Sequence, residues 1–199
     1  MNDIKVMNRA ADNIRVLAAS MVEKAKSGHP GGAMGGADFI NVLFSEYLVY
    51  DPKNPEWEGR DRYFQDPGHM SPMLYSALAL TGKFTMEELS MFRQWGSPTP
   101  GHPEVDIKRG IENTSGPLGQ GHTYAVGAAI AAKFLKARLG DVMNQTIYAY
   151  FASSRALRIS FTSFPLMLIT FQPHASYFIA TFSVVTSSTV VESWMLLES

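Results

Sequence analysis

Residues 114–122 of this chain read Thr114-Ser115-Gly116-Pro117-Leu118-Gly119-Gln120-Gly121-His122, and a run rich in alanine and leucine follows them as far as Leu139. Three glycines in six residues permit backbone conformations and close approaches that a Cβ atom would forbid. Alanine and leucine favour a helix over residues 125–139, with Gly140 as its stop. A glycine-rich loop that leads into a helix N-terminus can present backbone N–H groups to an anion such as phosphate. A tight turn without a ligand is the alternative interpretation of this loop by itself.

The overall composition describes an ordinary globular domain. With 199 residues the chain is long enough for one domain with a real core. Its net charge of −1 gives no electrostatic argument for binding nucleic acid or an anionic membrane. Cysteine is absent, which excludes disulfides, thiolate metal sites and a cysteine nucleophile. The N-terminus does not have the pattern of a signal peptide, so we expect a soluble, cytoplasmic protein.

Hydrophobic periodicity predicts the secondary structure of the first 151 residues. Apolar residues recur at a spacing of three to four over residues 3–26, which predicts an amphipathic helix that ends at Ser27-Gly28. Thr85 begins a capping-box pattern, so a helix should start there. Helices with strands between them indicate an α/β fold with a parallel sheet. The remaining predicted elements are helices over residues 37–48, 70–81 and 85–95, a strand end within 60–65, and a buried strand over 146–151.

The composition changes abruptly near residue 152. From residue 152 to residue 199 the chain contains no Gly, Asp, Asn or Lys. A folded α/β domain needs such residues for its turns and its solvated faces. Residues 159–191 lack charge, but prolines and polar residues interrupt them, so we expect β-prone, aggregation-prone segments and no membrane span. We therefore expect a partial domain over residues 1–151 and an atypical tail of uncertain structure over residues 152–199.

Four of the five histidines lie in or beside loops that contain glycine or proline. Such loops commonly carry catalytic groups, and neutral imidazole suits proton transfer near pH 7. For any one of these histidines, a surface or structural role is the alternative. No single motif here is specific, whereas all four in this order and spacing are. The motifs are Ser27–Gly31 with His29, Gly68-His69, Pro100–Glu104 with His102, and Gly116–Gly121 followed by His122.

In these motifs the sequence resembles the N-terminal part of transketolase, a thiamine-diphosphate enzyme, from about Asn8 to about Tyr150. The resemblance also includes the segment Asp61–Phe64. It implies a diphosphate-binding domain with helices on a parallel sheet, incomplete here at its C-terminal end, whose first strand is 146–151. It further implies a cytoplasmic transferase of carbohydrate metabolism, in the pentose phosphate pathway. Such an enzyme moves a two-carbon ketol group between sugar phosphates and is a homodimer in the full-length family.

The resemblance also assigns roles to individual residues. His29 and His102 would be catalytic: His29 would hydrogen-bond the sugar substrate and assist proton transfer, and His102 would contact the first hydroxyl groups of the donor. Gly116 would offer its backbone to the cofactor. The residues that would bind thiamine diphosphate are His69, Gly116, Pro117 and Leu118.

Some positions depart from the family pattern. Asp66-Pro67 stands where the family more often has a small polar pair, and His122 where an apolar residue is commoner. A larger departure concerns Mg²⁺, which bridges to the diphosphate and needs hard oxygen ligands. Family members follow the strand at 146–150 with Gly-Asp-Gly and, about thirty residues later, an Asn that together hold this metal. Here no Asp or Asn occurs after Asn144, so no metal ligands are expected in this chain.

Several interpretations remain open at this point. The chain could be a transketolase N-terminal region whose true reading frame ends near residue 151, inactive by itself. It could instead be a non-catalytic phosphate-binding or partner module, or the N-terminal subunit of a split transketolase. Dihydroxyacetone synthase is a further enzyme alternative. Since an incomplete sheet leaves an exposed edge, we expect a poorly soluble or partner-dependent product.

Overall fold

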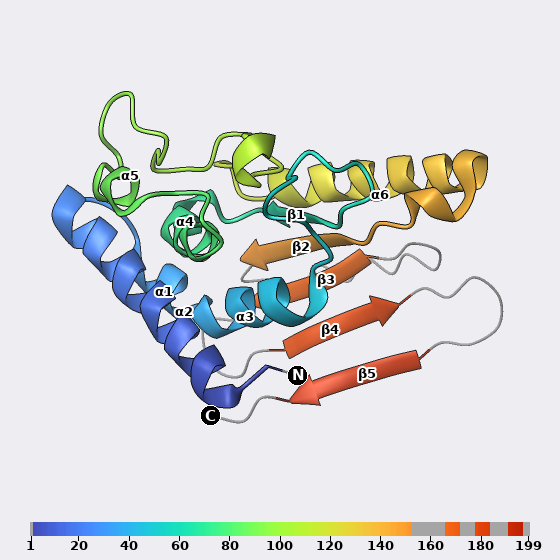
Figure 1. Cartoon of the computed structure of the whole chain (residues 1–199), viewed down its shortest axis with the longest axis horizontal. Coiled ribbons are helices and arrows are strands. Elements are labelled where there is room, and N and C mark those ends of the chain that lie inside the picture. Colours follow the sequence, from blue (N-terminus) through green and yellow to red (C-terminus); the bar gives the residue numbers. More distant parts are fainter. Residues whose placement is uncertain (1, 153–165, 172–177, 184–190, 197–199) are drawn as a thin grey trace. The chain divides into compact units, whose positions relative to one another are not determined.

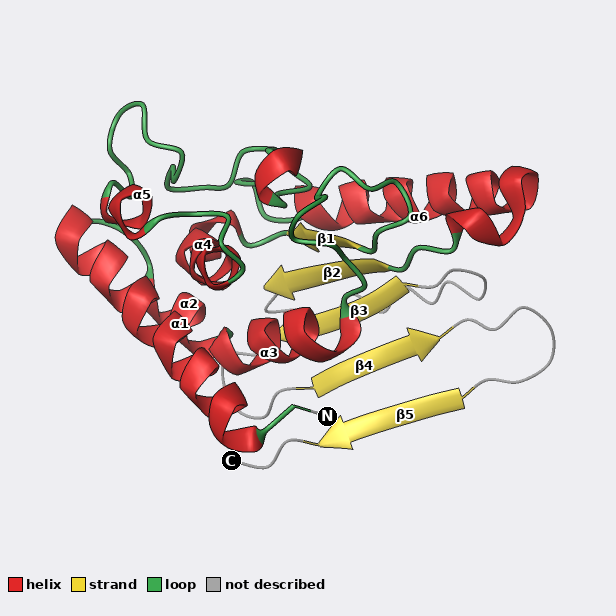
Figure 2. Cartoon of the chain, in the orientation of Figure 1, coloured by secondary structure: helices red, strands yellow, loops and turns green. Residues whose placement is uncertain are grey.

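The structure is a computed structural model of the chain and describes residues 2–152, 166–171, 178–183 and 191–196 (Figure 1). The chain divides into two compact units, Met1–Glu56 with Gly68–Gly116, and Trp57–Pro67 with Pro117–Ser199. A short segment of the second unit therefore interrupts the first along the sequence. Helices predominate in the first unit, whereas the sheet belongs to the second (Figure 2).

The first unit begins with the predicted amphipathic helix, which is confirmed as α1, Ile4–Ala25. Asp3 caps it by accepting the N–H of Lys5. The helix ends at Lys26, which adopts a left-handed conformation with φ of 51° and donates its N–H to the carbonyl of Glu23. Helix α1 packs on α4. Its buried residues are Ala11, Ile14, Ala18 and Met21.

The helix predicted over residues 70–81 is confirmed as α4, whereas two other helices of the first unit are shorter than the sequence predicts. The helix expected over 37–48 is α3, Ala37–Val42, followed by a π-helical turn over Leu43–Tyr47. The helix expected to run from Thr85 to about residue 95 ends at Ser90, because Arg93 adopts a left-handed conformation with φ of 62°. The remaining elements are α2 (Pro30–Gly35), a 3-10 turn (Gly68–Met70), α4 (Ser71–Leu80), α5 (Met86–Ser90) and a second 3-10 turn (Ile107–Arg109).

The second unit is built on a five-stranded sheet in the order β1-β2-β3-β4-β5. Strands β1, β2 and β3 run parallel, whereas β3, β4 and β5 pair antiparallel. The predicted α/β fold with parallel strands is confirmed, but the last two strands reverse direction. The expectation that residues 146–151 form the first strand was wrong, because β1 precedes β2 and pairs with it. The strands are β1 (Arg62–Gln65), β2 (Ile147–Ala152), β3 (Leu166–Phe171), β4 (Phe178–Ser183) and β5 (Val191–Leu196).

Helix α6, Gln120–Leu139, covers β1 and β2 in the second unit (Figure 1). It begins before the alanine-rich run, at Gln120, and ends at Gly140 as predicted. Small side chains allow the helix to lie close to the sheet. The buried cluster between them consists of Phe64, Ala125, Ala129, Ala132, Ile147 and Ala149.

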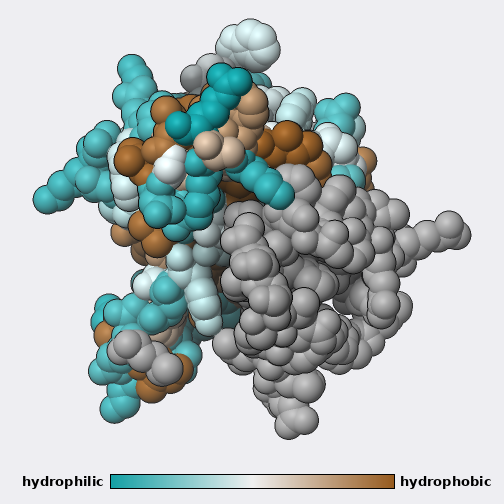
Figure 3. All heavy atoms as spheres, turned by 90° about the vertical axis from the view of Figure 1, so that its right-hand side faces the viewer, coloured by the Kyte–Doolittle hydropathy of each residue, from teal (hydrophilic) through white to brown (hydrophobic). Residues whose placement is uncertain are grey.

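The opposite side of α6 exposes large apolar side chains, among them Ile130 and Phe134, which are 53% and 54% exposed. Figure 3 shows a face of the chain on which hydrophobic residues lie among hydrophilic ones. No helix in the described part of the chain is long and apolar enough to cross a membrane. The uncharged run 159–191 falls largely outside the described residues, and its described stretches include β3 and β4.

Candidate functional site

The His29 loop follows α1 directly and depends on a glycine. Gly28 has φ of +138°, a conformation that residues with a Cβ rarely adopt. A Cβ atom at this position would also lie 2.9 Å from Cγ2 of Val22. His29 then precedes α2, whose first residue is Pro30, as suits a helix start. These local requirements place the exposed imidazole of His29 at the N-terminal end of α2.

Close packing of α2 on the 3-10 turn brings His29 to His69. A Cβ atom on Gly32 would lie 2.9 Å from Sδ of Met70, so glycine permits this approach. The ring centroids of His29 and His69 are 5.2 Å apart, in an edge-to-face arrangement with an interplanar angle of 67°. Two residues that lie 40 positions apart in the sequence thus form one imidazole pair.

Gly68 is the point at which the other two motifs meet this pair. A Cβ atom on Gly68 would lie 2.8 Å from Cδ2 of His102 and 3.0 Å from the backbone N of Gly116. The same atom would lie 2.9 Å from the carbonyl carbon of Ser115. Glycine is therefore required here for space. The structure brings His29, His69, His102 and Gly116 together in the first unit.

The loop that carries His102 is held by buried side chains of α4. Ser71 donates a 2.8 Å hydrogen bond from Oγ to the carbonyl of Gly101, and Tyr75 donates a 2.9 Å bond from its hydroxyl to the carbonyl of Pro100. Both donors are fully buried. An irregular loop has no backbone ladder of its own, so these bonds satisfy its carbonyls and fix its position.

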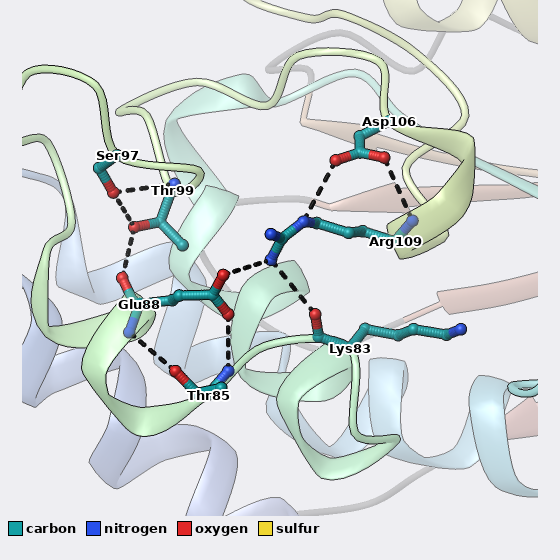
Figure 4. Close-up of polar contacts among 7 residues, drawn as sticks. All are labelled: Lys83, Thr85, Glu88, Ser97, Thr99, Asp106 and Arg109. Carbon is teal, nitrogen blue, oxygen red and sulfur yellow. Dashed lines mark hydrogen bonds and ion pairs between the residues drawn. The ribbon is translucent and has the colours of Figure 1, made fainter.

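A polar network anchors the same loop to α5 (Figure 4). Buried Thr99 donates a 2.8 Å hydrogen bond from Oγ1 to the carbonyl of Glu88. The predicted capping box is confirmed, since Glu88 accepts the N–H of Thr85 and Thr85 accepts the N–H of Glu88. The Glu88 carboxylate also pairs with Arg109 at 2.8 Å. Arg109 in turn pairs with Asp106, so one network joins α5, the His102 loop and the 3-10 turn at Arg109.

The surroundings of His102 favour the neutral imidazole. Partial burial, then the positive charge of Arg93 and then His29, lower the pKa of His102 below its usual value. A neutral imidazole can accept a proton or a hydrogen bond near pH 7. Beside it, Ser115 donates its backbone N–H to the carbonyl of Pro103, while its buried Oγ has no hydrogen-bond partner. A buried hydroxyl without a partner marks a place where an additional polar group fits.

Pro117 and Leu118 belong to the second unit, and both are exposed. They follow Gly116 directly in the sequence, so the boundary between the two units falls inside the glycine-rich loop. Their predicted contact with thiamine diphosphate stays a prediction, as do the roles of His29, His69, His102 and Gly116.

The N-terminus of α6 is occupied by a carboxylate of the chain itself. Oδ1 of Asp66 accepts 2.8 Å hydrogen bonds from the backbone N–H groups of both Gly119 and Gly121. A Cβ atom on Gly121 would lie only 2.4 Å from Cα of Asp66. The expectation that this loop offers its N–H groups to an external anion is therefore wrong for these two. Nδ1 of His122 lies 3.9 Å from the same Asp66 oxygen. Asp66 and His122, which both depart from the family pattern, are thus neighbours in the structure.

The described residues contain no group of three or more His, Asp or Glu side chains that could hold a metal ion. The segment that follows β2, where the sequence comparison with the family expects metal ligands, lies outside them. Sequence reasoning also missed the residues that support the histidine loops, above all Ser71, Tyr75, Thr99 and Arg93. The one sequence feature that pointed toward them is the glycine- and proline-rich segment before His102, which indicates an irregular loop that other side chains must hold.

Comparison with known proteins identifies the family of the chain. Residues 6–157 match the family described as transketolase, thiamine diphosphate binding domain. Transketolase 1 of Escherichia coli (strain K12) is 50% identical over 145 residues, which cover 70% of this chain and 22% of that protein. Transketolase from Campylobacter jejuni has a similar structure, with a TM-score of 0.72 and 43% identity over 76% of this chain and 24% of that chain.

A further similar structure is transketolase from Pichia stipitis in complex with sedoheptulose 7-phosphate. Its TM-score is 0.68 at 36% identity, and the match covers 74% of this chain and 22% of that chain. The chain thus spans roughly a fifth to a quarter of the length of these relatives. Since the family match covers most of the 199 residues, the chain belongs to the transketolase family, in its thiamine-diphosphate-binding domain.

Proposed function

We propose that this chain is the cofactor-binding part of a transketolase that transfers a two-carbon ketol group from a ketose phosphate to an aldose phosphate. The observation that carries the proposal is the convergence of three histidine loops on Gly68 and Gly116 within one compact unit. Membership of the family supports the cofactor, and the sugar phosphate bound by the Pichia stipitis relative supports the substrate class.

The residues present fit a thiamine diphosphate molecule on the side of the first unit. Gly116 leaves open backbone, since the nearest atom to a Cβ built on it is Cδ2 of His102 at 4.0 Å. The hydroxyl of Ser115 is buried without a partner. When bound, the cofactor supplies the ylid that carries the carbon–carbon chemistry. We propose that Gly116, Pro117, Leu118 and His69 hold it.

Two histidines would handle the substrate. The lowered pKa of His102 keeps its imidazole neutral, so it can accept a hydrogen bond from a donor hydroxyl or donate one to it. His29, exposed at the start of α2 and paired with His69, can hydrogen-bond the sugar and move a proton at its hydroxyl. Both imidazoles lie on loops whose positions are fixed by packing, which is what proton transfer requires.

The described residues offer no cluster of ligands for Mg²⁺. The absence of Asp and Asn after Asn144 supports the interpretation that the chain is inactive by itself. We further propose that activity requires a partner, with homodimerisation as in the full-length family. The exposed apolar side chains of α6 supply a surface that favours such association.

A titration of thiamine diphosphate followed by NMR tests this proposal. We expect the ring signals of His69 and His102 to shift, and Gly116→Ala to weaken the effect by placing a methyl group where the cofactor approaches the backbone. The substitution is sterically tolerated, since Gly116 has no neighbour closer than 4.0 Å to the new Cβ and no positive φ. Gly127→Ala, in α6 and without any atom within 4 Å, is the matched control.

A parallel titration with inorganic diphosphate separates the two classes of function. A cofactor site should bind thiamine diphosphate more tightly than diphosphate, because the thiamine part adds apolar contacts. Equal affinities would instead favour a phosphate-binding module. If no histidine signal moves at millimolar thiamine diphosphate, the proposed function is refuted for this chain.

A further inference from the structure

Arg93 lies between the two loops that carry His29 and His102. Its Nη1 donates a 2.8 Å hydrogen bond to Oγ of Ser27, two residues before His29. A Cβ atom on Gly101, the residue before His102, would lie 2.8 Å from Nε and 3.1 Å from Cζ of Arg93. The guanidinium group therefore contacts both loops, all within the first unit.

The absence of a side chain at Gly101 leaves the space that Arg93 fills. Its φ is not positive, so an alanine would be free to adopt the same backbone conformation. The predicted clash is with the guanidinium and with Cγ of Arg93, at 3.3 Å. The glycine of the motif that precedes His102 thus serves a contact made by a residue eight positions earlier.

The backbone at Arg93 shows how firmly this contact is imposed. Arg93 has φ of 62°, and a residue other than glycine persists there only when its surroundings hold it. Its N–H donates a 3.0 Å hydrogen bond to the carbonyl of Thr99, which belongs to the His102 loop. Next to it, the buried ring of Phe92 would lie 3.3 Å from a Cβ on Gly28. Phe92 thus lies against Gly28, the residue before His29, and Arg93 lies against Gly101, the residue before His102.

We infer that Arg93 is a positioning residue, which holds the Ser27–His29 segment against the Thr99–His102 segment. The inference rests on the proposed function, in which these two histidines act on the substrate. The contact does more than pack, because it places a positive charge beside His102. After partial burial, this charge is the second cause of the lowered pKa of His102, and His29 is the third.

The test measures the histidine rings and the backbone amides by NMR, without cofactor. Arg93→Met keeps much of the side-chain length but removes the charge and the hydrogen bond. We expect it to raise the pKa of His102 and to shift the amide signals of Gly28 and Gly101. Arg93→Lys keeps the charge but not the planar fork, so the pKa of His102 should stay near its wild-type value while both amides shift.

Two further variants make the outcome decisive. Ser27→Ala removes only the acceptor, and we expect it to shift the amides on both loops, Gly101 included. Arg9→Met, at an exposed arginine on α1, should change none of these signals. If Arg93→Met folds and leaves the pKa of His102 and both amides unchanged, the inference is wrong.

If Arg93→Met does not fold, Ser27→Ala decides, and an unshifted Gly101 amide then overturns the inference. The measurement does not depend on thiamine diphosphate. Failure of the chain to bind the cofactor would therefore refute the proposed function and leave the role of Arg93 standing. Unchanged NMR signals in the Arg93 and Ser27 variants would refute the role of Arg93 and leave the proposed function standing.

Discussion

Gly121 has no room for a side chain, because the first turn of α6 lies directly on the end of β1. A Cβ atom there would be 2.4 Å from Cα of Asp66, which is backbone and cannot move aside. We expect Gly121→Ala to destabilise the chain by about 1–3 kcal/mol, as overpacking in a core does. Gly127→Ala, in the same helix with open space around it, should stabilise by about 0.5–1 kcal/mol. Denaturant unfolding followed by circular dichroism measures both, and equal effects would contradict the structure.

The same contact marks the limit of what the sequence alone predicts about single residues. The glycine-rich loops are predictable from sequence, and His29, His69 and His102 come together within the first unit. That Asp66 binds the amides of Gly119 and Gly121 was not foreseeable, because the partners lie 53 and 55 positions apart. Ser27 and Arg93 lie 66 positions apart. Local pattern carries no information on which distant polar group reaches an N–H or a hydroxyl.

At the scale of elements, the sequence predicted α1 and the C-terminal ends of α1 and α6 well, because amphipathic spacing and glycine stops are local signals. It placed the end of α5 too late, because the left-handed turn at Arg93 is imposed by contacts with Ser27 and Thr99. It also did not count β1 as a full strand. The four residues of β1 form a strand by pairing in parallel with β2, a partner that lies far away in the sequence.

Helix α5 provides a test of the network around Glu88. The N–H of Thr85, and then the hydrogen bond and charge of Arg109, lower the pKa of Glu88, although burial opposes them. A carboxylate with a lowered pKa stabilises the fold above its ordinary value, 4.5, and loses this contribution as the pH falls through the folded-state pKa. We therefore expect Glu88→Gln to destabilise the chain at pH 7, and less so as the pH falls below 4.5.

The control for this prediction is Glu87→Gln. Glu87 occupies the same first turn of α5, so both substitutions remove the same favourable charge from the helix N-terminus. Only Glu88 forms the capping box and pairs with Arg109. Urea unfolding of both variants at pH 7 and below pH 4.5 gives the comparison. A Glu88→Gln effect that is independent of pH, or equal to that of Glu87→Gln, would show that the network contributes nothing.

For the molecule as a whole, family membership and the chemistry of this chain lead to different expectations. The sequence predicted a transketolase-type domain, and the family match and the solved relatives confirm it. The loops that carry His29, His69 and His102 meet within the first unit. Beyond residue 151 the chain contains no Asp or Asn, the residues that the resemblance leads us to expect as metal ligands there. The motifs thus predict the cofactor, whereas the absence of Asp and Asn after Asn144 predicts that this chain holds the cofactor without a metal ion.

That difference leads to a measurable outcome for the whole chain. A diphosphate with no metal bridge keeps its full negative charge, and protein N–H groups and imidazoles alone neutralise it poorly. We expect thiamine diphosphate to bind weakly, with the same affinity in the presence of millimolar Mg²⁺ or of EDTA. Calorimetric titration under both conditions measures this affinity. Binding that tightens tenfold or more with Mg²⁺, by about 1.4 kcal/mol, would mean that this chain supplies metal ligands that its sequence does not reveal.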